Sequence, residues 1–156
     1  FIYLSIDCYG WGGPWQERPG WEQLAQATSG MMAAQGTDKE PALQPTIPND
    51  YLTGYLGALG VLIALLRRAE EGGSYRVRTS LTRTAMWIQD HGTIDRSLWP
   101  SAPMPADYVN GYMLTSQTPI GTLRYLGPVV RYEETPSHWT LPPAPLGAHP
   151  PRWPED

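Results

Sequence analysis

The longest apolar stretch of the chain runs from Tyr51 to Leu66 and is closed by Arg67-Arg68 and Gly72-Gly73. Apolar residues occupy nearly the whole circumference of a helix drawn through this stretch, so the pattern predicts a helix that neighbouring elements bury on most sides. The stretch is shorter than the roughly 20 residues that cross a bilayer, and glycines interrupt it. We therefore expect a buried helix of a soluble domain and no membrane segment.

Gly54, Gly57 and Gly60 recur at every third position of this helix and leave a stripe without side chains. Each glycine costs about 1 kcal/mol of helix propensity relative to alanine. The stripe therefore indicates that something approaches the helix closely. Packing against another backbone is the more frequent use of such a stripe, and the approach of a ligand is the alternative.

The flanking segments predict further elements of an α/β fold. These elements are a strand buried on both faces at Phe1–Ile6, a Gly-rich aromatic loop at 7–15, a helix from about Trp21 to Met32 with Leu24, Thr28 and Met31 on one face, a strand at Tyr75–Thr79 and a helix at Leu81–Ile88. Gly30 is expected to weaken the last turn of the first helix, because glycine is a poor helix former.

Most of the 17 prolines follow residue 92. Proline fixes φ and removes a backbone donor, so regular helices and central strands are not expected in that part of the chain. We expect an α/β half-domain at residues 1–92 and a Pro-rich C-terminal segment at 93–156 that packs on it. Within this segment, Leu123–Tyr132 is expected to form an extended pair folded about Gly127-Pro128.

The composition of the chain argues against several classes of function. The chain has 156 residues, 41% of them hydrophobic, and a formal net charge of -4, so one domain-sized core is feasible. Acidic and basic residues are interspersed, which argues against surfaces for nucleic acid or anionic membranes. The single Cys8 and three scattered histidines form no pair at metal-ligand spacing, so we expect no metal and no disulfide framework.

The beginning of the chain also carries information. The chain opens on Phe1, in what resembles a strand already under way, so we expect a piece of a larger polypeptide. No signal-peptide pattern is present, which makes the cytoplasm the default location.

Asp50 stands at the start of the long apolar helix, directly after Pro48-Asn49. An aspartate at this place is either the N-terminal cap of the helix, for which Asp is a preferred residue, or a reactive carboxylate that the helix dipole keeps ionised. Residue type alone favours the cap. Asn49 is an alternative cap that would leave Asp50 free for chemistry.

Several strings in the chain resemble segments of the family III CoA transferases, a group that includes formyl-CoA and carnitine–CoA transferases and α-methylacyl-CoA racemase. The strings are Gly13-Pro14-Trp15, Arg18-Pro19-Gly20-Trp21-Glu22, Asp50, Thr53-Gly54, Ala64-Leu65-Leu66-Arg67-Arg68, Gly72-Gly73, Arg76-Val77-Arg78-Thr79-Ser80-Leu81 and Gly127-Pro128-Val129-Val130-Arg131-Tyr132. Their combined order makes the resemblance specific. It covers Phe1 to about Ile88 well and the tail weakly.

The resemblance implies part of a Rossmann-like CoA-transferase large domain with a Pro-rich C-terminal extension. It also implies CoA transfer between carboxylic acids through an aspartyl covalent intermediate, with Asp50 as the nucleophile. Acyl-CoA and a carboxylic acid are then the substrates, Arg18 is a candidate to bind a CoA phosphate, and Trp21 is a candidate to stack on adenine or line a thioester channel. Because the family forms interlocked dimers, the expected partner is a second copy or a complementary CoA-transferase-like subunit.

Departures from the family pattern leave other hypotheses open. The N-terminal half and the small domain of the family have no counterpart here, Trp21 replaces a histidine of the racemase branch, and Thr82-Arg83 replaces a usual acidic residue. A non-catalytic structural or regulatory half of a CoA-transferase-like complex is therefore the main alternative, and a stand-alone binding module is a third. In the catalytic interpretation, Asp50 faces a dry thioester pocket that other polypeptide completes.

Overall fold

The structure, a computed structural model, describes residues 1–102, 104–105 and 107–153. The chain divides into two compact units, Phe1–Leu98 and the part from Trp99 onward. The first unit contains β1 (Ile2–Asp7), α1 (Glu22–Thr28), α2 (Met31–Gln35), α3 (Pro48–Glu71), β2 (Tyr75–Ser80), α4 (Leu81–Asp90) and a short 3-10 turn at Arg96–Leu98. The predicted packing of residues 93–156 on the first part stays a prediction.

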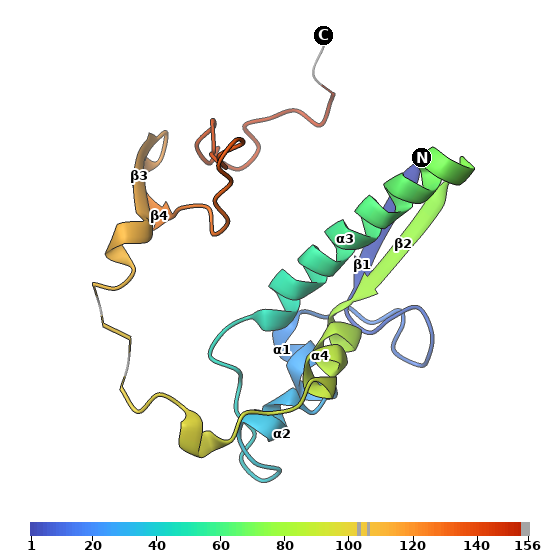
Figure 1. Cartoon of the computed structure of the whole chain (residues 1–156), viewed down its shortest axis with the longest axis vertical. Coiled ribbons are helices and arrows are strands. Elements are labelled where there is room, and N and C mark those ends of the chain that lie inside the picture. Colours follow the sequence, from blue (N-terminus) through green and yellow to red (C-terminus); the bar gives the residue numbers. More distant parts are fainter. Residues whose placement is uncertain (103, 106, 154–156) are drawn as a thin grey trace. The chain divides into compact units, whose positions relative to one another are not determined.

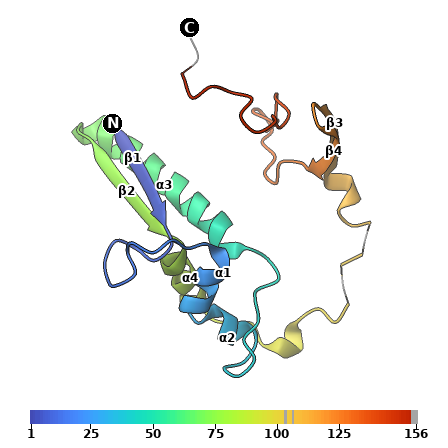
Figure 2. The same cartoon turned by 180° about the vertical axis from the view of Figure 1, so that it is seen from behind.

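The strands β1 and β2 pair in parallel, with Leu4 opposite Val77 and Asp7 opposite Ser80. Parallel neighbours need a crossover connection, and here the polypeptide from the end of β1 through α1, α2 and α3 supplies it. Figures 1 and 2 both show α3 running alongside the two strands. The expected α/β fold class is confirmed, since helices and a parallel strand pair alternate along this unit.

Two of the three glycines in the stripe provide the contact between α3 and the strands. A Cβ atom added at Gly57 would lie 3.2 Å from Leu4 Cδ2, and one added at Gly60 would lie 2.6 Å from Val77 Cγ1. Nothing lies within 4 Å of the corresponding position at Gly54. Close packing on β1 and β2 therefore explains Gly57 and Gly60, and it leaves Gly54 without such a role.

The expectation that neighbours bury α3 on most sides is wrong for this chain. Its buried residues are Asn49, Thr53, Gly57 and Ala64, whereas large apolar side chains on its other faces are exposed; among them are Tyr51, Tyr55, Leu59, Leu62 and Leu66. The physical reason is that the sheet and the short helices cover one side of α3 only. The apolar circumference therefore marks surface that is not covered within the described part of the chain.

The length of α3 also differs from the expectation. It spans 24 residues, because the helix starts at Pro48 and continues through the charged residues up to Glu71. By length and composition this helix is long and apolar enough to cross a membrane. The sequence-based argument that the segment is too short is thus wrong, since it counted only the apolar core of the helix.

The strand β1 is not buried on both faces. Leu4 faces α3, but Tyr3 is 54% exposed and Ile6 is 50% exposed. The sheet has only the strands β1 and β2 in the described residues, and no described helix covers the face that carries Tyr3 and Arg76.

The helix predicted from Trp21 to Met32 is two helices. Gly30 adopts a positive φ of 81° and begins α2, so the predicted weakness at Gly30 is a complete break. The predicted face is also wrong in part, because Thr28 is exposed and the buried residues of α1 are Glu22, Ala25 and Gln26. Two of these three buried side chains are polar, which a hydrophobic pattern does not reveal.

The second unit contains a short 3-10 turn at Asn110–Tyr112 and a hairpin of β3 (Met113–Thr118) and β4 (Gly121–Leu126). These strands pair in antiparallel fashion, with Thr118 opposite Gly121. The extended pair predicted about Gly127-Pro128 is therefore wrong in position, since Gly127-Pro128 follows the hairpin. The hairpin turns instead at Pro119-Ile120, and Gly121, which follows as the first residue of β4, has a φ of +115° that glycine adopts easily.

Candidate active site

The candidate site lies where the carboxyl ends of the parallel strands meet the start of α3. Burial raises the pKa of the Cys8 thiol, and the negative charges of Asp7 and Asp50 raise it further. Cys8 directly follows β1 and its sulfur lies 3.8 Å from the Trp21 carbonyl, while the next residue, Glu22, accepts the backbone N–H of Asp50, so α1 links the end of that strand to the start of α3. The carboxyl ends of parallel strands are the usual place for ligand sites in open α/β sheets.

Asp50 is not the cap of α3. Ile47 is the N-cap residue, its side chain makes no capping hydrogen bond, and Asp50 lies in the first turn of the helix. The backbone N–H of Asp50 instead donates to Oε2 of Glu22 at 2.8 Å. A carboxylate from α1 thus satisfies an N–H group that has no partner within its own helix.

Glu22 anchors a small buried network. Its side chain is 2% exposed, and Oε1 accepts hydrogen bonds from Nε2 of Gln26 at 2.7 Å and Nδ2 of Asn49 at 2.9 Å. Gln26 in turn accepts from the backbone N–H of Gln44 at 2.9 Å. The network joins α1, the loop before α3 and the first turn of α3, so it fixes the position of Asp50.

Sequence reasoning missed the role of Glu22. In the sequence, Glu22 stands out only as part of a family-like string, and Asn49 is a candidate cap for α3. Asn49 is fully buried, yet it donates to Glu22 and does not cap the helix. The available signal was the pair Glu22 and Gln26, whose spacing of four places both polar side chains on one face of a helix.

The carboxylate of Asp50 is exposed and has no hydrogen bond or ion pair among the described residues. The described residues do not enclose this carboxylate by themselves, and the dry pocket that other polypeptide is expected to complete stays a prediction. Gly54, one helical turn further on, lies on the same side of α3 and has open space beside it. A reacting group could thus approach Asp50 without meeting a side chain at Gly54.

A cavity of about 340 Å³ lies next to this part of α3. Ile47 and Tyr51 line it from the start of the helix, Gln26 lines it from α1, and Leu43 and Pro45 line it from the loop. Its walls combine apolar side chains with a few amides, a pattern common in small-molecule sites. Tyr51 directly follows Asp50, but Asp50 itself does not line the cavity.

Among the described residues, no hydrogen bond, ion pair or ring contact joins Arg18 or Trp21 to the Asp50 side chain. The guanidinium of Arg18 lies 4.8 Å from the centre of the Trp15 ring, and Trp15 meets the ring of Tyr9 at 5.3 Å in an edge-on arrangement. These contacts order the Gly-rich loop after β1. The side chain of Trp21 is 57% exposed, while its carbonyl accepts the first backbone bond of α1 from Ala25.

Within residues 1–102, 104–105 and 107–153, no group of three or more His, Cys, Asp or Glu side chains is arranged to hold a metal ion. Cys8 is buried and unpaired, next to a glycine that must stay small. A Cβ atom at Gly20 would lie 2.4 Å from the Cys8 sulfur. Cys8 is therefore a packing residue in this fold.

The sequence matches the profile of CoA-transferase family III over residues 1–108, which includes β1, α3, β2 and all of the site described above. The chain belongs to CoA-transferase family III.

The relatives of this family III chain are longer proteins. This chain is 41% identical to the acetyl-coenzyme A transferase nodX of Hypoxylon pulicicidum, and the match covers 63% of this chain and 17% of nodX. An acyl-CoA transferase of Gibberella moniliformis is 32% identical and matches 95% of this chain and 33% of its own length. The beta subunit of succinyl-CoA–L-malate CoA-transferase from Chloroflexus aurantiacus is 33% identical over 57% of this chain and 22% of its own.

The fold is similar to that of solved family members. A CaiB/BaiF family protein from Brucella suis matches 78% of this chain and 33% of its own, with a TM-score of 0.54 and 25% identity. The chain thus spans a third or less of the length of the relatives and the solved structure named here.

Proposed function

We propose that this chain takes part in CoA transfer between carboxylic acids, with Asp50 as the nucleophile. The proposal rests on the different roles of two carboxylates at the start of α3: Glu22 binds the helix backbone, and Asp50 does not. Glu22 accepts the N–H of Asp50, so the Asp50 side chain is not needed to cap the helix. Its carboxylate lies in the first turn, where the helix dipole favours negative charge.

The proposed reaction has two covalent stages. The Asp50 carboxylate attacks the thioester carbonyl of acyl-CoA and the C–S bond breaks. The CoA thiolate departs, and the product on the enzyme is an aspartyl–acyl anhydride. The thiolate then attacks the aspartyl carbonyl, which releases the first carboxylate and forms an aspartyl–CoA thioester. The acceptor carboxylate attacks this thioester and the same steps run in reverse, so that Asp50 is regenerated and a new acyl-CoA leaves.

Backbone N–H groups at the start of a helix can stabilise a tetrahedral oxyanion. The N–H of Asp50 is already bonded to Glu22, so that donor is used for positioning. In the proposal, Glu22 holds the first turn of α3 and thereby the nucleophile, and other polypeptide supplies oxyanion donors and excludes water. Exclusion of water matters because an anhydride hydrolyses readily.

The proposal therefore includes a larger, Rossmann-like assembly. The exposed apolar faces of α3 and the uncovered face of β1 and β2 support it, because parallel sheets are normally covered on both faces. The names of the Chloroflexus aurantiacus relatives include an alpha subunit and a beta subunit. A second copy of this chain or a complementary CoA-transferase-like subunit is the proposed partner.

One observation favours the alternative of a non-catalytic structural or regulatory half. The Asp50 carboxylate is exposed in this chain, and a reaction through an anhydride needs a site from which water is excluded. In this alternative, the chain stabilises a catalytic partner while Asp50 stays unreacted.

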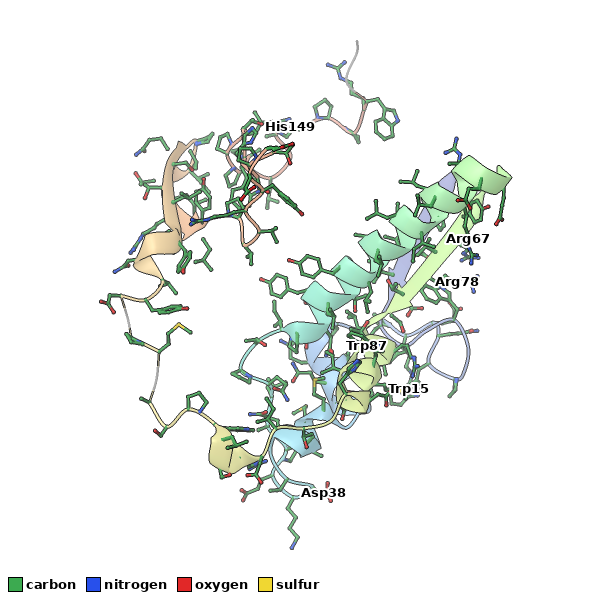
Figure 3. The ribbon with its side chains drawn as sticks, viewed as in Figure 1. Trp15, Asp38, Arg67, Arg78, Trp87 and His149 are labelled. Carbon is green, nitrogen blue, oxygen red and sulfur yellow. The ribbon has the colours of Figure 1, made fainter. Side chains whose placement is uncertain are left out.

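Covalent trapping separates the two functions. The assembly that contains this chain is incubated with acetyl-CoA, treated with hydroxylamine and analysed by peptide mass spectrometry. We expect a hydroxamate on Asp50, no transfer by Asp50→Asn, and unchanged transfer by Asp38→Asn, which changes an exposed aspartate in the loop after α2 (Figure 3). An unmodified Asp50 in an assembly that is active in transfer would favour the structural role.

A further inference from the structure

A second cavity, of about 400 Å³, lies at the carboxyl ends of β1 and β2 and is separate from the cavity lined by Ile47 and Tyr51. The loop after β1 contributes Tyr9 and Trp11, the end of β2 contributes Arg78 and Ser80, and α4 contributes Arg83 and Met86. Two segments that are far apart in the sequence therefore build one cavity around two arginines and an indole.

Within the part of the chain that the structure describes, neither arginine forms an ion pair with a carboxylate. The guanidinium of Arg78 lies 5.3 Å from the centre of the Trp11 ring. Figure 3 shows Arg78 on the side of β2 that faces the loop after β1. Asp7 ends β1 nearby, but its Oδ1 accepts the backbone N–H of Gly10 at 2.6 Å and Asp7 does not line the cavity.

The local backbone adds to the positive potential. The helix α4 has 10 residues and begins directly at the cavity, with Ser80 as its N-cap. The hydroxyl of Ser80 accepts the N–H of Arg83 at 3.4 Å, so the first turn of α4 is fixed. The positive end of the helix dipole and two guanidinium groups thus act on the same space.

We propose that this cavity binds a phosphate group. Two guanidinium groups match the charge of a phosphate monoester dianion better than the single charge of a carboxylate, and each presents several N–H donors in a fixed plane. The Trp11 indole lies beside the charges and offers a flat surface for a ring attached to the phosphate. The contact with Trp11 holds the Arg78 side chain in place. Arg78 therefore loses less conformational entropy when a phosphate binds.

The phosphate has two possible sources: the nucleotide end of coenzyme A and a free phosphorylated metabolite. The assignment of a phosphate site depends on this cavity alone. Only its attribution to coenzyme A rests on the proposed function.

Binding is measured by calorimetry on the native assembly, with adenosine 3′,5′-bisphosphate, inorganic phosphate and acetate as probes. We expect adenosine 3′,5′-bisphosphate to bind and the double variant Arg78→Gln/Arg83→Gln to weaken this binding roughly tenfold for each arginine removed. The matched control is Arg76→Gln, since Arg76 is on the same strand and stacks on Tyr3 at 6.0 Å outside the cavity. Both arginines of the cavity are exposed, so these substitutions should leave folding intact.

Fluorescence gives a second measurement. We expect the bound probe to change tryptophan emission, and Trp11→Phe to remove most of that change. Tighter binding of adenosine 3′,5′-bisphosphate than of inorganic phosphate supports coenzyme A as the source, and equal binding supports a free phosphorylated metabolite.

Three results would overturn the phosphate site: equal affinity of the wild type and the double variant, equal loss in Arg76→Gln, or acetate binding as tightly as phosphate. Reaction of Asp50 with an acyl-pantetheine, which lacks the nucleotide, tests the role of Asp50 as a nucleophile independently of the phosphate site. This reaction should be unchanged in Arg78→Gln/Arg83→Gln if both proposals are correct. It fails in the wild type if the proposed function is wrong, whatever the phosphate probes show.

Discussion

The backbone N–H of Asp50 donates to the Glu22 carboxylate at 2.8 Å across 28 positions of sequence. The two acidic residues at this point have different environments, since Glu22 is buried among three donors and Asp50 is exposed. One carboxylate therefore completes the helix terminus, and the other remains available for chemistry.

Glu22→Ala is expected to destabilise the protein by about 2–4 kcal/mol. The substitution removes the carboxylate acceptor of the buried Gln26 and Asn49 amides and leaves them only long contacts, at 3.5 Å to the Thr46 carbonyl and 3.8 Å to the Met31 sulfur. It also removes the partner of the Asp50 N–H. Urea unfolding followed by circular dichroism measures the change. Glu17→Ala, which changes an exposed loop carboxylate, should stay within about 0.5 kcal/mol of the wild type. Equal stability of the two variants would contradict the role of Glu22.

Gly60→Ala and Gly54→Ala are expected to change stability in opposite directions. A methyl group at Gly60 lies 2.6 Å from Val77 Cγ1, and valine has little rotamer freedom, so overpacking should cost about 1–3 kcal/mol. At Gly54 nothing lies within 4 Å, so alanine should stabilise α3 by up to about 1 kcal/mol. Thermal unfolding midpoints measure both effects. Val77→Ala should restore much of the stability lost in Gly60→Ala, and no restoration would exclude this clash as the cause.

The hydroxyl groups of Thr53 and Thr84 join α3 to α4 at 2.8 Å in a buried position. Thr53→Val is expected to cost about 1–3 kcal/mol, because it leaves the Thr84 hydroxyl buried without its partner. The double variant Thr53→Val/Thr84→Val should be less destabilised than the sum of the two single variants, because no polar group is then left unpaired. A double-mutant cycle in urea measures the coupling, and strictly additive effects would contradict it.

Cys8 should react slowly with iodoacetamide in the native protein. Burial raises the pKa of its thiol, so less thiolate is present at neutral pH than for an exposed cysteine, and the sulfur is also shielded. The reaction in urea is the control and should be at least about tenfold faster at pH 8. A similar rate in both states would show that the thiol is accessible.

The raised pKa of Cys8 also has a consequence for stability, with a definite sign. The folded state favours the protonated thiol, so this contribution is fully present below the ordinary thiol pKa of about 8.5. It is lost as pH rises through the higher pKa of the folded state. Cys8→Ala has no such group and should therefore lose less stability than the wild type between pH 7 and pH 10 in urea unfolding. An identical pH dependence would argue against the shift.

Local patterns predicted the elements of the first unit well. The strand expected at Tyr75–Thr79 is Tyr75–Ser80, and the helix expected at Leu81–Ile88 is Leu81–Asp90. Both follow from side-chain periodicity. Ser80, the N-cap of α4 in the structure, is a local start signal for this helix that the prediction did not use. The glycine stripe was also interpreted correctly at Gly57 and Gly60, where the helix approaches the strands.

The candidate site was predicted less completely, because its decisive contacts join distant positions. Glu22 is a buried carboxylate on a short helix, and hydrophobic periodicity treats such a position as surface. The exposure of Asp50 and of α3 has a related cause. The sequence indicates that a helix is apolar, but it does not indicate whether the covering elements belong to the same chain.

The bond between Glu22 and the first turn of α3 couples two helices that are not neighbours in sequence. The N–H of Asp50 in the first turn of α3 has this partner only when α1 is docked, so detachment of α1 also frees the start of the long helix. The exchange rate of the Asp50 amide hydrogen with deuterium therefore reports on the docking of α1. Measuring this one amide thus shows whether the proposed nucleophile is held in place.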